Sequence, residues 1–386
     1  MGRPFLWPSG CAVSLQMESK SKRAGIFLSI ACGLIALGPA LSASDGKFDV
    51  GIDRSNMIWI TKPEQAAIFA GIKKTGVRWF RDAFAYPVNR TADFIDVVRQ
   101  AKQAGLKMLV VVTQSPDDYD DATAANAGPA FEKLCGWPGG SLKLSEMNLS
   151  KFKIRLRGLL DGLKARGLEV DAFEIGNEVD WVCFNGDVPY GRDASPDDVL
   201  IAARGYARFL EAAAETIHAA MPRAKLITFG MAHIDDVWDK PPRHHLPNPA
   251  AFVASLRNLD GKNYLTNARY GVDGYGSHIY PDRDDIKGSV AATLAADTHA
   301  LGTELPFWIT EFGFLAGQFP NRTGQTRGQA VEIFFKTLAG AGAQFGPVFY
   351  YAYDGDDLGL VDARGALLPE AYVLARQCGV CAPPRR

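Results

Sequence analysis

The feature that most constrains this chain is a strict alternation of short apolar segments with helical patterns. β-branched and aromatic residues fill the apolar segments, which is typical of buried strands. The alternation predicts an α/β fold with a parallel sheet, because each helix carries the chain back to the edge where the previous strand began. The segments expected to be strands are 50–55, 77–84, 107–114, 171–180, 225–232, 271–281, 306–314 and 347–354.

The number of these units selects among the α/β folds. Eight strand–helix units, with no linker or composition break between them, predict a single closed (β/α)8 TIM barrel within residues 44–386. An open doubly wound sheet is the alternative. An open sheet of this kind usually carries a glycine-rich phosphate-binding loop after an early strand, and the sequence has none there.

Local signals support the helices of this barrel. Residues 61–64 combine a capping box with a proline at the first helical position, which predicts a helix start. An apolar stripe with spacing i, i+3, i+4 and i+7 indicates a second helix over 94–101. Further capping signals stand at 195–198 and 326–329, and a closing helix is expected after Pro369.

The N-terminal segment 1–43 has the pattern of a secretory signal. A basic group at 20–23 precedes an apolar run at 24–38, and the small residues at 40–43 offer a cleavage site. Met17 is a candidate start. The apolar run is short for a spanning helix, although an uncleaved anchor stays open as an alternative. We expect a secreted or periplasmic protein without stable membrane association after cleavage.

Charge and cysteine usage narrow the partners. The formal net charge is −1 and no stretch is strongly basic, so nucleic acid is not an expected partner. In an exported chain, Cys135 and Cys183 could pair, and Cys378 and Cys381 could form a bridge in the tail. A zinc site is the rival interpretation, but no histidine has the companion spacing. No metal or cofactor is expected, and no pattern indicates the oligomeric state.

Chemically active side chains gather where the strands are expected to end. In a (β/α)8 barrel the carboxyl ends of all strands meet at one rim, and the active site lies there. Glu178 is expected to end the fourth strand and Glu311 the seventh, so both carboxylates would face one pocket. Arg81 is expected to end the second strand, and His278 and Tyr280 share one face of the sixth. Paired carboxylates at one site are what glycoside hydrolysis requires.

These residues, in this order, resemble glycoside hydrolase clan A, especially families five and thirty-nine. The resemblance extends over roughly residues 48 to 377. It rests on four matches in chain order: Arg81, Asn177-Glu178, His278-Ile279-Tyr280 and Trp308-Ile309-Thr310-Glu311-Phe312-Gly313. The matched strands are the second, fourth, sixth and seventh, as in those enzymes, and the order makes the resemblance specific.

The resemblance implies a retaining mechanism. Glu178 would be the general acid/base and Glu311 the nucleophile. Asn177 would bond the 2-hydroxyl of the reacting sugar, while Arg81 and Tyr280 would hold Glu311 charged through hydrogen bonds. His278 is expected to be a further substrate-binding residue.

Aromatic side chains are candidates for contacts with sugars, because their faces pack well on the apolar faces of pyranose rings. Trp181 follows the predicted acid closely, and Tyr350 lies on the eighth strand. Trp137 and Trp238 stand in long loops and are further candidates. The adjacent pair His244-His245 is interpreted as part of a solvated loop, because neighbouring histidines point apart and make a poor metal site.

Two positions depart from the family pattern. The eighth strand carries Tyr350 and Tyr351 where clan members usually have a tryptophan, and the third strand ends in Thr113-Gln114 where many family-five members have a histidine. These changes affect how the reacting sugar is bound, and they leave the carboxylate pair intact.

The leading hypothesis is a secreted retaining β-glycosidase that hydrolyses a β-linked polysaccharide or oligosaccharide, with an endo-β-glucanase or an exopolysaccharide hydrolase favoured by the long loops. A transglycosylase would use the same two glutamates. A barrel that binds glycans without cleaving them is a rival from another class. A metal-dependent barrel enzyme is a more distant alternative, since it would want several histidine or aspartate ligands at strand ends.

Overall fold

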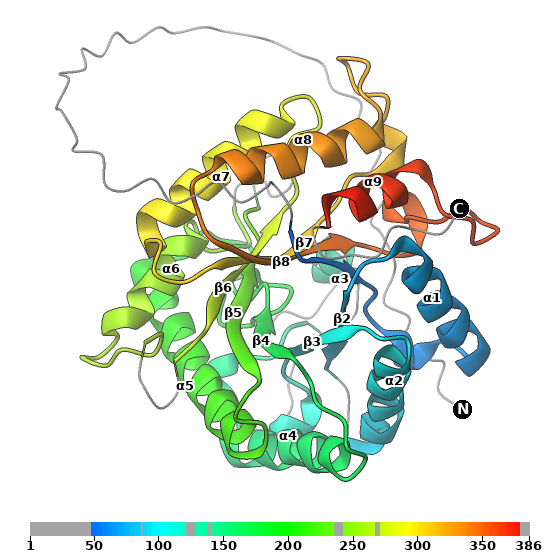
Figure 1. Cartoon of the computed structure of the whole chain (residues 1–386). Coiled ribbons are helices and arrows are strands. Elements are labelled where there is room, and N and C mark those ends of the chain that lie inside the picture. Colours follow the sequence, from blue (N-terminus) through cyan, green and yellow to red (C-terminus); the bar gives the residue numbers. More distant parts are fainter. Residues whose placement is uncertain are drawn as a thin grey trace, which may run out of the picture.

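The computed structural model describes residues 48–85, 88–120, 129–136, 140–234, 242–266 and 271–378. Eight parallel strands close into one barrel in chain order, with helices around it (Figure 1). This confirms the predicted (β/α)8 fold. The strands are β1 (Val50–Asp53), β2 (Trp79–Phe84), β3 (Lys107–Val112), β4 (Ala172–Asn177), β5 (Lys225–Met231), β6 (Gly274–Ile279), β7 (Phe307–Phe312) and β8 (Phe345–Tyr351).

The helices begin and end where the local signals predict. Thr61 caps the first helix through a complete capping box, and Gly76 ends it in the left-handed conformation. Ser195 and Thr326 form capping boxes at two later helices. The helices are α1 (Lys62–Thr75), α2 (Thr91–Gln103), α3 (Pro129–Cys135), α4 (Leu149–Lys164), α5 (Pro196–Ala220), α6 (Pro249–Ser255), α7 (Ile286–Leu301), α8 (Arg327–Gly340) and α9 (Pro369–Gln377).

The hydrophobic core has two parts. A large layer lies between strands and helices, where for example Phe312 of β7 stacks on Phe334 of α8 with ring centroids 4.1 Å apart. A smaller cluster fills the barrel interior and comes from six strands. Its members are Trp79, Leu109, Ala172, Ile227, Trp308 and Phe349. This plug closes the interior on the amino-terminal side, so the polar residues further along the strands lie next to a layer of apolar side chains.

The two ends of the described chain meet. Phe48 donates its N–H to the carbonyl of Gln377 at 3.0 Å, and α9 packs against α1 and α8. Cys378 forms a disulfide, and Cys381 lies outside the described residues. The predicted signal at 20–43 also lies outside them. Within the described residues, no helix combines the length and apolarity that crossing a membrane requires.

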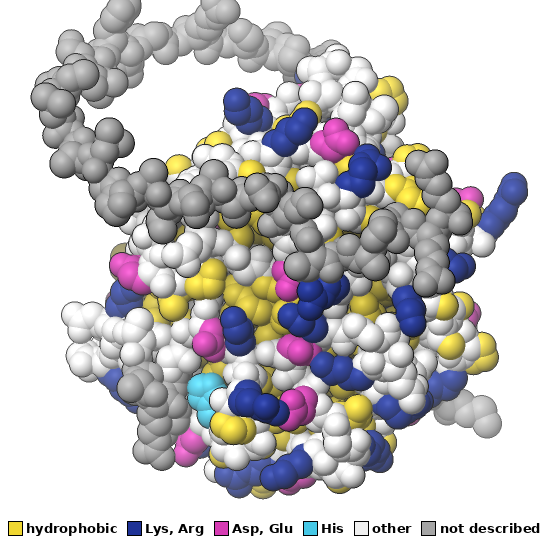
Figure 2. Space-filling view, in the orientation of Figure 1, with side chains coloured by type: hydrophobic (Ala, Val, Ile, Leu, Met, Phe, Trp, Pro, Cys, Tyr) yellow, Lys and Arg dark blue, Asp and Glu magenta, His cyan; other side chains and the backbone are white. Residues whose placement is uncertain are grey.

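The face seen in Figure 2 carries charged side chains of both signs scattered among hydrophobic ones. A cavity of about 550 Å³ near the amino-terminal ends of the strands is lined by Trp79, Trp308, Lys107 and Lys225, among others. The acidic Asp49 and Asp171 line it too, so its charges are mixed. This cavity lies below the interior plug, at the end opposite to the polar residues described next.

Candidate active site

The structure brings six of the predicted residues together above the interior plug, at the carboxyl ends of the strands. They are Arg81, Asn177, Glu178, His278, Tyr280 and Glu311. Glu178 and Tyr280 follow directly after β4 and β6, and Glu311 is the penultimate residue of β7. Arg81 was predicted to end the second strand, but it is the third residue of β2. Its long side chain reaches up from there to the rim.

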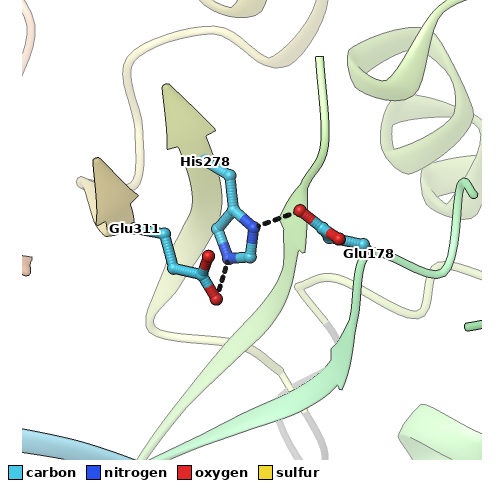
Figure 3. A group of neighbouring side chains, drawn as sticks. All are labelled: Glu178, His278 and Glu311. Atoms are coloured by element: carbon cyan, nitrogen blue, oxygen red, sulfur yellow. Dashed lines mark hydrogen bonds and ion pairs between the residues drawn. The ribbon is translucent and has the colours of Figure 1, made fainter. Parts of the chain in front are cut away.

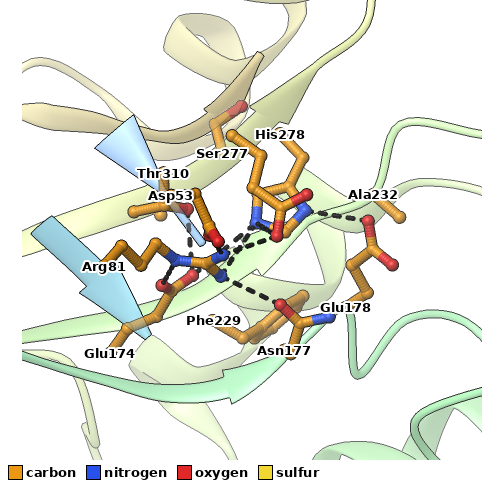
Figure 4. Close-up of polar contacts among 12 residues, drawn as sticks. Asp53, Arg81, Glu174, Asn177, Glu178, Phe229, Ala232, Ser277, His278 and Thr310 are labelled. Atoms are coloured by element: carbon orange, nitrogen blue, oxygen red, sulfur yellow. Dashed lines mark hydrogen bonds and ion pairs between the residues drawn. The ribbon is translucent and has the colours of Figure 1, made fainter. Parts of the chain in front are cut away.

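Arg81 is the hub of the cluster (Figure 4). Its side chain is 1% exposed. Its guanidinium donates to Glu174 at 2.7 Å, to Glu311 at 2.6 Å and to Asn177 at 2.9 Å, and it also pairs with Asp53. A planar fork of donors can hold several acceptors in fixed directions, which a lysine ammonium cannot do. Arg81 therefore sets the relative positions of groups from β1, β4 and β7.

His278 lies between the two predicted catalytic glutamates (Figure 3). Its Nδ1 is 2.8 Å from Oε1 of Glu178, and its Nε2 is 3.6 Å from Oε1 of Glu311. One polar atom from each of the three residues lies within 4.8 Å of the other two. Tyr280 completes this group, because its hydroxyl donates to Oε2 of Glu311 at 2.6 Å. Each oxygen of Glu311 thus accepts a charge-assisted or short hydrogen bond.

A close backbone approach makes room for His278. A Cβ atom on Gly230 of β5 would lie 2.0 Å from Nε2 of His278, so no other residue fits at that position without displacing the imidazole. Gly230 also accepts the N–H of Glu178 at 3.2 Å. The glycine therefore holds both partners of the hydrogen bond between His278 and Glu178 in place.

A β-bulge turns Glu311 toward the barrel interior. Trp308 points into the interior plug, so strict alternation would turn Glu311 outward. The pairing of β7 shifts by one residue against both β6 and β8 in this stretch. As a result, Thr310 and Glu311 both face inward: Thr310 donates to Glu174 at 2.9 Å, and Glu311 meets Arg81. Bulges often redirect side chains next to functional sites in this way.

Glu178 and His278 have shifted proton affinities. Burial raises the pKa of Glu178, and the Glu311 carboxylate adds to this, although the hydrogen bond from His278 opposes it. Burial opposes charge on His278, but the surrounding glutamates raise its pKa to about 10. Burial thus shifts Glu178 toward its protonated form, and the glutamates around His278 favour the charged imidazole.

Sequence reasoning missed Glu174 and assigned no role to Asp53. Burial would raise the pKa of the fully buried Glu174, but Arg81 overcomes this and lowers it. Burial raises the pKa of Asp53 to about 6, with Arg81 opposing and Glu311 contributing. The missed signal was an ionisable residue inside a strand that is otherwise apolar, two or more residues before its end.

The aromatic predictions have different outcomes. Tyr350 does not face the site: it is fully buried against Phe312 between β8 and the outer helices, with ring centroids 5.2 Å apart. Its assignment to substrate binding is wrong, because strand alternation turns it away. Its neighbour Tyr351 faces the carboxylates instead. Burial raises the pKa of Tyr351, and the nearby charges of Glu311 and Asp53 add to it.

Trp181 lies in the segment after β4, where its backbone N–H donates to the backbone carbonyl of Glu178 at 2.9 Å. Its ring packs on Phe184, and it forms a bridge with His245. Its role in binding substrate stays a prediction. His245 is 7% exposed, so the interpretation of His244-His245 as a solvated loop is wrong for the second residue. Trp137 and Trp238 lie outside the described residues.

The segment that follows Glu178 is cross-linked to its neighbours. Cys135 and Cys183, which the sequence left open as a pair, form a disulfide that ties this segment to α3. Val182 donates to the carbonyl of His244, which fastens the segment to the region after β5. Glu178 itself has a φ of 42°, in the left-handed region that non-glycine residues rarely adopt. These links hold the strained backbone in place.

A metal ion at this site would have to use the same atoms. Among the described residues, Glu178, His278 and Glu311 form the group whose ligand atoms lie close enough to hold an ion. Nδ1 of His278 is already engaged by Glu178, and Oε1 of Glu311 by Arg81. The adjacent guanidinium also disfavours a second cation. The expectation of no metal or cofactor stays a prediction.

Comparisons with known proteins give structural neighbours only. No known protein family and no curated protein matches the sequence. Among solved structures, the β-glycosidase BGL167 matches with a TM-score of 0.54 and 13% identity, covering 89% of this chain and 100% of that chain. A family 1 β-glucosidase from Thermotoga maritima matches with a TM-score of 0.55 and 13% identity over 86% of this chain and 97% of that one.

An endo-β-1,4-mannanase from Thermotoga petrophila matches with a TM-score of 0.52 and 10% identity, covering 86% of this chain and 76% of that chain. At such low identity these matches establish the (β/α)8 fold and leave the chemistry to the residues of the site. The resemblance to clan A rests on the sequence motifs alone.

Proposed function

We propose that this protein is a retaining β-glycosidase in which Glu178 is the general acid/base and Glu311 the nucleophile. The observation that carries the proposal is the approach of the two carboxylates, which place oxygen atoms within 4.8 Å of each other beside His278. Retaining enzymes hold their carboxyl groups about 5–5.5 Å apart, whereas inverting enzymes need about 6.5–9.5 Å to admit a water molecule. The short separation favours double displacement.

The environments of the two glutamates support different roles. Glu311 accepts hydrogen bonds from Arg81 and Tyr280, which stabilise the carboxylate form that attacks the anomeric carbon. Burial and the neighbouring Glu311 raise the pKa of Glu178, which favours the protonated form. Glu178 then gives its proton to the leaving oxygen as the C–O bond breaks and the bond to Glu311 forms.

In the second half of the reaction Glu178 takes a proton from water, and the water oxygen displaces Glu311 from the anomeric carbon. Asn177, which accepts a hydrogen bond from Arg81 at 2.9 Å, would bond a sugar hydroxyl. The substrate class is a β-linked polysaccharide or oligosaccharide, and export through the segment 20–43 would place the enzyme in the periplasm or the medium.

Two alternatives use the same site. A transglycosylase would transfer the glycosyl group to a sugar hydroxyl, and product analysis at high acceptor concentration separates it from a hydrolase. A glycan-binding barrel would not need a buried acid beside a hydrogen-bonded carboxylate. The arrangement of Glu178 and Glu311 therefore favours an enzyme.

The test begins with a panel of β-1,3-, β-1,4- and β-1,6-glucans, xylan and mannan. With a substrate in hand, we expect Glu311→Gln to abolish turnover and Glu178→Ala to lose activity that azide partly restores, because azide replaces water without needing a general base. Glu304→Gln, a change in an exposed glutamate, is the control. Full activity of Glu311→Gln on any panel substrate would exclude the mechanism.

A further inference from the structure

A buried polar cluster lies between the segment after β5 and α7, outside the barrel interior. Nε2 of His233 is 3.1 Å from Oδ2 of Asp297 and 3.2 Å from Oγ of Ser277. Ser277 donates to the same carboxylate oxygen at 3.3 Å. Ser277 lies on the helix-facing side of β6, since its neighbour His278 faces the interior. The mechanism proposed above makes no use of these three side chains.

The cluster favours a positive charge on His233. Asp297 is fully buried, and its Oδ1 has no hydrogen-bond partner within the described part of the chain. A buried carboxylate is costly unless a cation compensates it. His233 is the cation at hand: burial opposes its charge, but Asp297 outweighs this and raises the pKa of His233. His233 and Asp297 thus form an ion pair with Ser277 as their shared neighbour.

The ion pair is tied to the acid/base residue by two short routes. Ala232, next to His233, donates its N–H to both oxygens of Asp180 at 3.3 and 3.2 Å, and Asp180 is two residues after Glu178. On the other side, Ser277 precedes His278, whose Nδ1 contacts Glu178 at 2.8 Å. Figure 4 shows Ala232 and Ser277 beside this contact.

The backbone of His233 has a strained conformation that its contacts must maintain. His233 has a φ of 46° and Glu178 a φ of 42°, so both residues lie in the left-handed region although neither is glycine. Such a conformation is strained for a non-glycine residue and persists where its surroundings fix it. The bonds of His233 to α7 and β6 supply that restraint at the end of β5.

We propose that His233, held by Asp297, is a positioning residue that fixes Glu178 for proton transfer. This inference rests on the proposed function, because it assigns a task to the acid/base residue. His233 acts through the ends of β5 and β6 and does not touch the substrate. The charged or titratable groups around it are Asp297 from α7, Asp180 from the segment after β4 and His278 from β6.

The test compares two aryl glycosides that carry the glycone of the best panel substrate. A phenyl leaving group needs a proton from Glu178, whereas 2,4-dinitrophenolate leaves without one. In Asp297→Asn we expect kcat/KM for the phenyl glycoside to fall about 10-fold or more, and that for the dinitrophenyl glycoside to change less than about 3-fold. His299→Gln, an exposed change on the same helix, is the matched control.

Equal losses on both substrates, or no loss on either, would overturn the positioning role. His233→Gln serves as a second variant if Asp297→Asn does not fold, and it should show the same split. NMR titration provides an independent readout, since the pKa of His233 should drop in Asp297→Asn. A wild-type protein inactive on every glycoside refutes the proposed function instead, so the two failures are distinguishable.

Discussion

The substitution Arg81→Lys tests whether one buried guanidinium organises the site. Lysine keeps the charge but replaces a planar fork by a compact ammonium. The guanidinium of Arg81 donates to Glu174 from Nε and to Asn177 from Nη2, at its opposite end. A single ammonium group cannot reach both acceptors. At least two charge-assisted hydrogen bonds should be lost, each contributing about 1.5–3 kcal/mol.

The expected loss of unfolding free energy is therefore about 4 kcal/mol, within the range found when a buried ion pair loses one partner. Unfolding entropy is about 2.1 cal/mol/K per residue, or about 0.7 kcal/mol/K for a barrel of roughly 330 residues. The melting temperature should fall by about 6 °C. Scanning calorimetry at pH 7 and one fixed scan rate measures this shift.

Arg204→Lys is the matched control. Arg204 makes an equally bidentate contact with Asp260, at 2.8 and 2.7 Å, but both side chains are more than half exposed. Exposed pairs contribute little, so its melting temperature should change by less than about 1 °C. In Arg81→Lys, kcat/KM should also fall at least about 10-fold, because Glu311 or Asn177 loses a donor. A melting temperature within 1 °C of wild type would refute the reasoning.

Three further predictions follow from other contacts. In His278→Asn the pKa of Glu178 should rise, because a group that lowers this pKa is removed. The alkaline limb of the pH profile of kcat/KM should then move to higher pH. An alkaline limb that stays in place or moves to lower pH would contradict this prediction. Burial raises the pKa of Asp180 from 3.8 to about 7, so its contribution to stability is full below pH 4 and is lost as the pH rises through 7. Asp180→Asn should therefore be more stable than wild type at pH 8, by up to about 4 kcal/mol in urea unfolding, and equal to it at pH 4. The double change of Cys135 and Cys183 to serine opens a link across 48 residues and should cost about 4 kcal/mol in the chain-entropy model, which an unchanged melting curve would contradict.

Much of the fold was predictable because its signals are local. Capping boxes at Thr61, Ser195 and Thr326 and the apolar strands repeat along the chain, and each is confirmed. Eight alternating units leave a closed parallel barrel as the simplest arrangement. The sequence left several roles open for the cysteines, and the structure shows the disulfide between Cys135 and Cys183.

The errors on the strands have one physical cause, which is the direction of side chains along a strand. Strand ends predicted from composition are uncertain by a residue or two, and each single-residue shift turns a side chain to the other face of the sheet. This error assigned Tyr350, which is buried against Phe312, to the substrate-binding residues. It also left Glu174 unnoticed, although its carboxylate anchors Arg81 at 2.7 Å.

The sequence alone determined that two glutamates would meet at one rim, because barrel topology brings the carboxyl ends of β4 and β7 together wherever they stand in the chain. Only the tertiary structure decided how they are held. The bulge that turns Glu311 inward, the space that Gly230 leaves for His278 and the four acceptors around Arg81 all depend on contacts between different strands. Their geometry depends on pairing register, and no local pattern in a chain encodes the register of its neighbours.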